Sequence, residues 1–160
     1  MKRISLLPSF LIIFIIGCSN QNINYEMKRD QNIEIIKLYV EEIWNKWNFE
    51  MIDSIIHEDF IDPASKTGAK GPEAFKEVMS DFQTIFPDIH MTLDEIVADK
   101  DLVAWKWTAT TTYTPKNKRV VLHGIIMDRI DEGKIVERWG YWNESVLNDI
   151  PGNDGIQEEE

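Results

Sequence analysis

The chain has 160 residues, 43% of them hydrophobic, and a formal net charge of −11 at pH 7. This length and composition suit one globular domain with a sizeable core. The acidic balance argues against nucleic acid as a partner, because phosphate binding requires a basic face, and against adsorption to anionic lipid surfaces.

The first twenty residues, MKRISLLPSFLIIFIIGCSN, have the organisation of a bacterial export signal. Lys2 and Arg3 precede an apolar run at 11–16, and the small Gly17 and Cys18 follow it. The run is too short to span a membrane comfortably. Its end, IIGC, resembles a bacterial lipobox, which implies cleavage after Gly17 and attachment of lipid to Cys18.

Cys18 is the only cysteine, so no disulfide can form within the chain. An uncleaved anchor helix, or an ordinary signal cut elsewhere, is the alternative interpretation of this segment. Ser19 follows the cysteine, where an Asp in Gram-negative lipoproteins would imply retention in the inner membrane. We therefore expect a signal peptide at 1–17, a polar tether at 18–29, and an exported protein anchored by its lipid to the bacterial envelope, at the outer membrane.

Three helices are predicted in the first half of the domain. The first should begin at Asp30 or Asn32, the second is a short helix after Asn48, and the third spans about 72–86 before Pro87 ends it. The first helix is indicated by apolar residues that recur at spacings of three and four: Ile33, Ile36, Val40, Ile43, Trp44 and Trp47.

From Asp88 onward the pattern alternates with a period of two. Four long strands are predicted, at 89–99, 102–114, 120–130 and 135–145, with a slip of the alternation near Glu95 that indicates a bulge. A brief strand or turn is expected at 59–62. Helices followed by strands predict an α+β fold for residues 30–148, with the helices covering one face of a curved antiparallel sheet above a pocket. The acidic tail at 149–160 should fray.

Three segments carry a resemblance to a known family: VEEIWNKWNFEMIDSIIHEDFID, GPEAFKEVMSDFQTIFPDIHMTLDEIVADKDLVAWKW and HGIIMDRIDEGKIVERW. They resemble the SnoaL-like polyketide cyclase group of the nuclear transport factor 2-like (NTF2-like) superfamily, over residues of about 30 to 147. The resemblance implies a cone of three helices on a strongly curved sheet. It implies no single reaction, because the superfamily contains cyclases, isomerases, dehydratases and binding modules.

The last predicted strand contains the stretch IVERWGYWNE, whose alternation aims Glu137, Trp139, Tyr141 and Asn143 at one face. The resemblance implies that Glu137 is the acid/base of an aldol ring closure and that His123 on the preceding strand helps bind the substrate. An apolar pocket would raise the pKa of a carboxyl and bring it nearer to working pH. Such a base needs no cofactor if donors steady the enolate, and His123, Tyr141 and Asn143 are the candidates.

Other interpretations of these residues stay open. Glu137 could pair with Arg129 or Arg138 instead, and His123 could be a satisfied core histidine. The chain has three histidines without local ligand spacing, so we expect no metal site and no cofactor. The predicted substrate-binding residues are Trp107, Trp139, Tyr141, Asn143 and Met127, and Trp142 is expected on the opposite face, available for association.

Two departures from the family pattern weaken the catalytic interpretation. No histidine follows Asp62, where many relatives have one, and Asn143 stands where relatives often have Asp. The first hypothesis is a cofactor-free acid/base enzyme, of cyclase or isomerase type, acting on a small and mostly apolar carbonyl compound. The second is a lipoprotein that binds a small molecule without catalysis, and the third is an interaction module. Relatives are often dimers through the sheet, which implies a homodimer.

Overall fold

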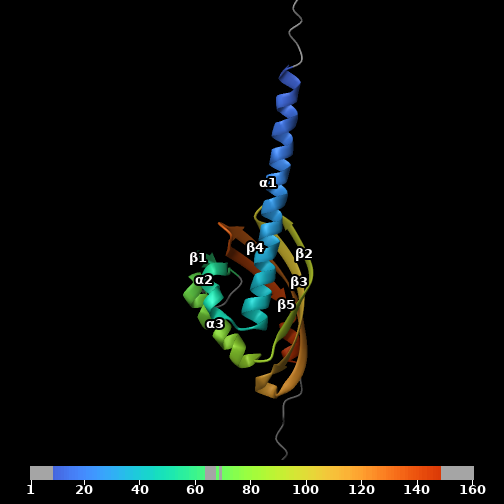
Figure 1. Ribbon diagram of the computed structural model, residues 1–160. Coiled ribbons are helices and arrows are strands. Elements are labelled where there is room, and N and C mark those ends of the chain that lie inside the picture. Colours follow the sequence, from blue (N-terminus) through green and yellow to red (C-terminus); the bar gives the residue numbers. More distant parts are fainter. Residues whose placement is uncertain (1–8, 64–67, 69, 149–160) are drawn as a thin grey trace, which may run out of the picture.

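The computed structural model describes residues 9–63, 68 and 70–148, so the first eight signal residues and the acidic tail at 149–160 lie outside the described part (Figure 1). The helical elements are α1 (Ser9–Tyr39), the π-helix η1 (Val40–Asn45), the 3-10 helix η2 (Phe49–Met51), α2 (Ile52–Ile55), α3 (Gly71–Ile85), and the 3-10 turns η3 (Thr114–Lys116) and η4 (Glu144–Leu147). The strands are β1 (Ile56–Ile61), β2 (His90–Asp99), β3 (Leu102–Tyr113), β4 (Lys118–Asp131) and β5 (Lys134–Trp142).

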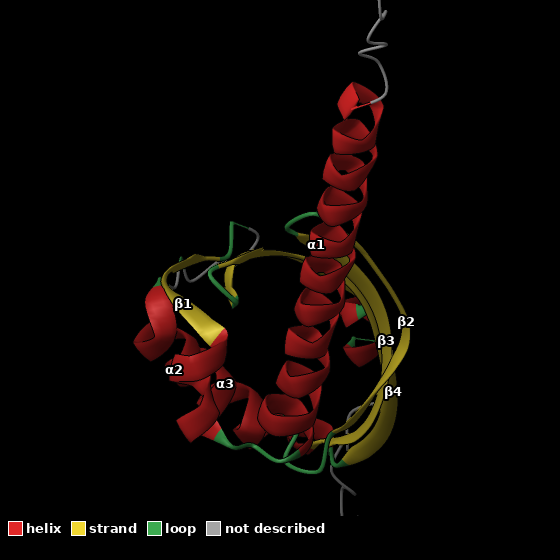
Figure 2. Cartoon of the chain, turned by 45° about the horizontal axis from the view of Figure 1, so that its top comes forward, coloured by secondary structure: helices red, strands yellow, loops and turns green. Residues whose placement is uncertain are grey.

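The strands form one sheet in the order β1-β5-β4-β3-β2, and it curves around the helices (Figure 2). Strands β2 to β5 are the antiparallel meander that the alternating pattern predicts. The slip predicted near Glu95 is confirmed, because the β2–β3 register shifts between Leu93 and Glu95. Strand β1, expected only as a brief strand or turn, adds a parallel edge beside β5. The predicted α+β class is therefore confirmed, with more short helical elements than expected.

The first helix is much longer than predicted, since it begins at Ser9 rather than at Asp30 or Asn32. Its polar segment is tied to the turn between β2 and β3. The Tyr25 hydroxyl donates to the Asp99 carboxylate, and the Asn32 amide donates to the Lys100 carbonyl at 2.9 Å. The part of the expected tether from Tyr25 onward is thus helical and docked on the domain. Within residues 9–63, 68 and 70–148, no helix combines the length and apolar character needed to cross a membrane.

The core fills the space between the concave face of the sheet and the helices. Helix α1 contributes Ile36, and η1 contributes Ile43, both fully buried. Helix α3 turns Phe75 and Met79 toward the same core. The concave face of β3 and β4 consists of alternating residues: Val103, Trp105, Trp107, Ala109, Val120, Leu122, Ile126 and Ile130. This alternation is the two-residue period of a strand with one buried face.

Candidate functional site

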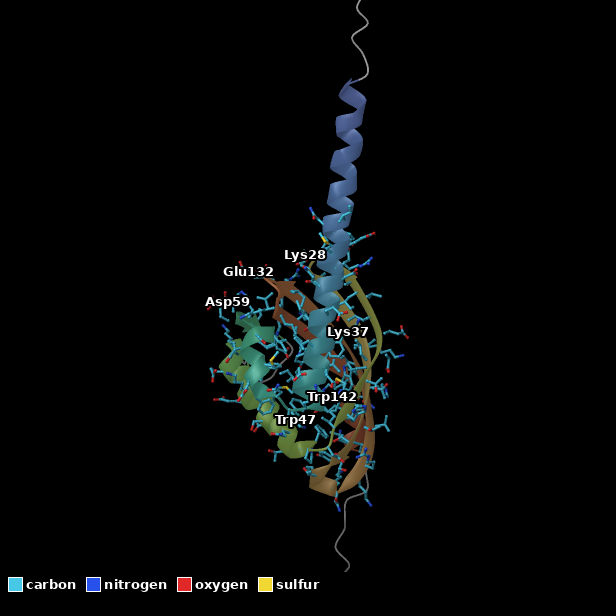
Figure 3. All side chains as sticks on the ribbon, viewed as in Figure 1. Lys28, Lys37, Trp47, Asp59, Glu132 and Trp142 are labelled. Atoms are coloured by element: carbon cyan, nitrogen blue, oxygen red, sulfur yellow. The ribbon has the colours of Figure 1, made fainter. Side chains whose placement is uncertain are left out.

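A cavity of about 250 Å³ lies between the helices and the concave face of the sheet. Its apolar walls come from both layers: Trp44, Phe75, Val78, Met79, Phe82 and Phe86 from the helical side, and Trp107, Leu122, Ile126 and Trp142 from the strands. Trp142 lies toward the end of the domain away from Lys28 and Glu132 (Figure 3). The part of the cavity beside Trp142 therefore lies away from the docked segment of α1.

A bulge in β5 decides which side chains face this cavity. Arg129 pairs with Glu137, but the next residue of β4, Ile130, pairs with Ile135, so Val136 is extra. Ile135 is fully buried on the concave face, and strict alternation would place Glu137 beside it. The extra residue reverses the alternation and turns Arg138 inward. The predicted pocket position of Glu137 is therefore wrong.

Glu137 lies on the convex face of the sheet. Its Oε2 accepts a hydrogen bond from Arg129 Nε at 3.1 Å, and Arg129 also pairs with Asp101. The Glu137 side chain is 23% exposed. The structure thus has the ion pair with Arg129 that the sequence left open, and this carboxylate cannot reach a molecule held in the cavity.

The other predicted site residues divide between the two faces. Trp107 lines the cavity, and its predicted contact with a substrate stays a prediction. His123 is exposed on the convex face. The backbone N–H of His123 donates a hydrogen bond to the side-chain Oδ1 of Asn143 at 2.8 Å, so the Asn143 side chain closes the end of the β4–β5 ladder. Met127 and Trp139 are cross-strand partners on the same convex face, where Met127 is 37% exposed.

Two aromatic residues near the end of β5 lie opposite to expectation. Tyr141 borders the cavity, but its side chain is 80% exposed, so the ring faces solvent and only the rest of the residue forms the border. Trp142, expected on the association face, lines the cavity. Both follow from the same reversal of alternation at Val136.

A buried polar network, which the sequence interpretation missed, lies beside the cavity. Arg138 Nε and Nη2 donate to Asp128 Oδ1 and Oδ2 at 2.7 and 3.1 Å, and Trp105 Nε1 donates to Asp128 Oδ2 at 2.8 Å. Arg138 Nη1 and Trp44 Nε1 both donate to the Tyr39 hydroxyl, at 2.6 and 2.9 Å. Asp128 and Tyr39 are fully buried, and Arg138 is 6% exposed. Buried charges of this kind require such pairing.

Two titratable residues of the network line the cavity, Arg138 and Tyr39, and each is held in one protonation state at neutral pH. Burial alone would lower the pKa of Arg138, but the Asp128 carboxylate outweighs that effect and raises it above the ordinary value. Burial raises the pKa of Tyr39, although the Arg138 charge opposes the rise. At neutral pH the guanidinium is therefore charged and the phenol keeps its proton.

The π-helix η1 brings Trp44 to this network. A π-helix aligns residues five apart, whereas an α-helix aligns those three and four apart. Trp44 follows Tyr39 by five positions, and its indole N–H reaches the Tyr39 hydroxyl. The Arg138 guanidinium also lies 4.3 Å from the centre of the Tyr39 ring. No distinct sequence signal marks this network, because Asp128 is followed by the charged Arg129 and Arg138 is preceded by the charged Glu137.

Trp107 carries an indole N–H that has no partner. Its Nε1 is buried and makes no hydrogen bond, the only such buried side-chain atom within the described ranges 9–63, 68 and 70–148. Gly124 is its cross-strand neighbour on β4, and a Cβ at that position would lie 2.8 Å from Trp107 Cζ2. A glycine at 124 therefore lets the indole lie flat against the sheet.

Charged groups around the cavity are few. Among its described lining residues, Asp62 is the only carboxylate and Arg138 the only cation. Within the described part of the chain, no group of three or more His, Cys, Asp or Glu residues could hold a metal ion. The site can thus hold a compact apolar molecule and offer it hydrogen-bond donors.

The sequence matches the family described as SnoaL-like polyketide cyclase over residues 34–148. A comparison with curated proteins found no match. Similar solved structures include a proposed polyketide cyclase from Acidithiobacillus ferrooxidans, with a TM-score of 0.65 and 21% identity, covering 71% of this chain and 89% of that one. Another, from Jannaschia sp. CCS1, has a TM-score of 0.69 and 13% identity, covering 76% and 91%. A third, from Bacillus cereus ATCC 10987, has a TM-score of 0.66 and 23% identity, covering 74% and 78%. At these identities the structures establish a shared fold.

Proposed function

The chain belongs to the SnoaL-like polyketide cyclase family, and from that premise we propose that it binds a small, mostly apolar molecule in the cavity between its helices and its sheet. The observation that carries this proposal is the cavity itself, about 250 Å³ with apolar walls and a few polar groups. Pockets for drug-sized ligands measure roughly 300–1,000 Å³. The expected ligand is therefore compact, nearer to one ring than to several.

A blocking substitution with a matched control tests this proposal. Val78→Trp puts a large ring into the cavity from α3, whereas Glu77→Trp adds the same ring to the exposed side of that helix. Small molecules that co-purify with the protein from its native host, identified by mass spectrometry, should be retained by the Glu77 variant and lost from the Val78 variant. Equal retention by both variants would contradict binding in the cavity.

Acid/base catalysis on a carbonyl compound is a second candidate, favoured by Asp62. Asp62 lines the same cavity as Tyr39 and Trp107. A carboxylate there would take the proton from a carbon next to a carbonyl, and the donors would stabilise the enolate oxygen. Turnover of a carbonyl substrate that survives in Asp62→Asn would rule out this role for Asp62.

The proposal also includes export and lipid attachment at Cys18, which the sequence IIGC supports. A diacyl modification would supply the two chains that stable anchoring requires. The wild-type protein should partition with the membrane fraction of its host, and Cys18→Ala should be released from it. A Cys18→Ala variant that is cut from its signal and still partitions with membranes would contradict lipid anchoring.

We further propose a homodimer through the convex face of the sheet. Exposed apolar side chains gather there on β4 and β5, namely Val121, Ile125, Met127 and Tyr141. Contiguous exposed apolar surface of this kind is typical of association sites. Ile125→Lys should convert the dimer to a monomer in light scattering, whereas Leu38→Lys, an equally drastic change on exposed α1 surface, should not. A monomeric wild-type protein would refute the proposal.

A further inference from the structure

We propose that the ligand of this cavity is an uncharged molecule that carries a hydrogen-bond acceptor, such as a ketone or ester carbonyl, and that Trp107 Nε1 and the Tyr39 hydroxyl donate to that acceptor. The inference rests on the proposed function, because it concerns the same cavity. It follows from a count of the polar groups around the cavity and from their charges.

The first donor is the Trp107 indole. An indole N–H can only donate, and this one is buried without an acceptor in a residue that lines the cavity. A buried donor without a partner carries its full desolvation cost until an acceptor arrives. A ligand carbonyl that enters beside the ring, with a small displacement of the indole, supplies that acceptor.

The second donor is the Tyr39 hydroxyl. A hydroxyl has one hydrogen to donate and two lone pairs to accept. Arg138 Nη1 and Trp44 Nε1 occupy the accepting side, and the O–H hydrogen has no acceptor among the described residues. Three of the five Arg138 N–H groups bond to Asp128 and Tyr39, and Arg138 lines the same cavity. Tyr39 and Arg138 thus offer donors to the cavity that they line.

The charges argue against an anionic ligand. The Arg138 guanidinium is already neutralised by the Asp128 carboxylate in a bidentate pair. A ligand carboxylate would lose its hydration without gaining an unpaired cation, which costs several kilocalories per mole in an apolar site. A ligand cation would face the guanidinium and a wall of donors.

Three probes of similar shape test this inference on the wild-type protein. Acetophenone carries the carbonyl acceptor, ethylbenzene lacks it, and benzoate replaces it with a negative charge. Dissociation constants from isothermal titration calorimetry at pH 7 should place acetophenone about 3- to 10-fold tighter than ethylbenzene, the ratio that one net hydrogen bond provides. Benzoate should bind more weakly than both.

Two tryptophan variants locate the donor. Trp107→Phe keeps an aromatic ring at the site and removes its N–H, so the preference for acetophenone over ethylbenzene should fall at least threefold. Trp139→Phe makes the same change on the convex face and should leave the preference as it was. If Trp107→Phe does not fold, the ranking of the three probes on the wild-type protein still decides the matter.

Each result bears on a different claim. Ethylbenzene binding as tightly as acetophenone would overturn the acceptor inference and leave the proposed binding function standing. Benzoate binding tightest would overturn the uncharged ligand. A wild-type protein that binds none of the three, even at millimolar concentration, would count against both the inference and the proposed function.

Discussion

The contrast between Trp105 and Trp107 gives a direct test of the buried polar network. The two indoles are two positions apart on the concave face of β3, and they are 1% and 6% exposed. Trp105 Nε1 donates to Asp128 at 2.8 Å, whereas Trp107 Nε1 has no partner. Substitution of either by phenylalanine removes a similar amount of buried ring, so the difference between the variants reports the hydrogen bond.

The structure fixes the size of that difference. A hydrogen bond to a charged group contributes about 1.5–3 kcal/mol, and Trp105→Phe loses it while leaving Asp128 with one donor residue, Arg138. Trp107→Phe loses no hydrogen bond and removes an unsatisfied buried donor. Trp105→Phe should therefore be the less stable variant by at least about 1.5 kcal/mol.

Urea unfolding at pH 7, followed by far-UV circular dichroism on ligand-free protein, measures the two free energies of unfolding. Equal slopes of free energy against urea for both variants would show that the same surface is exposed on unfolding. Equal destabilisation, or a larger loss in Trp107→Phe, would refute the assignment of one indole as satisfied and the other as unsatisfied.

Three further predictions concern other parts of the domain. Glu137→Gln should lower the free energy of unfolding by less than about 1 kcal/mol, because it weakens one partly exposed ion pair. The variant should bind acetophenone with unchanged affinity in the same calorimetric titrations. A loss of binding would show that Glu137 does contact the ligand. Tyr39→Phe leaves the Arg138 and Trp44 donors without their acceptor, so the free energy of unfolding in urea should fall by about 2–4 kcal/mol. An unchanged free energy of unfolding would contradict this role of the hydroxyl. A backbone hydrogen bond from Thr112, with hydroxyl bonds and Arg119, lowers the pKa of Asp88 to about 2. The Asp88 carboxylate contributes its full stability above the unfolded pKa of about 4, and this contribution is lost as the pH falls toward 2. The free energy of unfolding of wild type should therefore exceed that of Asp88→Asn by less and less between pH 5 and pH 2. A difference that stays constant over this range would contradict the pairing of Asp88.

The helix and strand pattern could be predicted because its signals are local. The two-residue period from Asp88 onward predicted the meander, and the slip near Glu95 predicted a real bulge. The parallel pairing of β1 with β5 could not be predicted, because it joins Ile56 to Ile135 across the whole length of the domain. The helical course of the expected tether from Tyr25 onward was missed because this segment lies on a distant turn, which no local pattern records.

The site residues were assigned to the wrong face for one physical reason. Strict alternation from Ile135 to Trp142 would place Glu137 on the same face as Ile135. The bulge at Val136 shifts the alternation by one residue, so Arg138 takes that face instead. A bulge inserts one residue, and one residue is half of the strand period, so every later side chain changes sides. Trp107, on the unbulged β3, was placed correctly. Arg138 lines the cavity on the face that the alternation had assigned to Glu137, and Tyr39 of α1 was not among the predicted site residues.

The central claim is that the concave cavity, and not the convex face that carries Glu137, holds the ligand. The chain has six tryptophans, so a ¹⁵N–¹H correlation spectrum has one indole N–H signal for each, assigned by single substitutions to phenylalanine. On titration with acetophenone, the Trp107 signal should move downfield as its N–H gains an acceptor, and the Trp139 signal should stay in place. A shift of Trp139 with Trp107 unmoved would contradict the account.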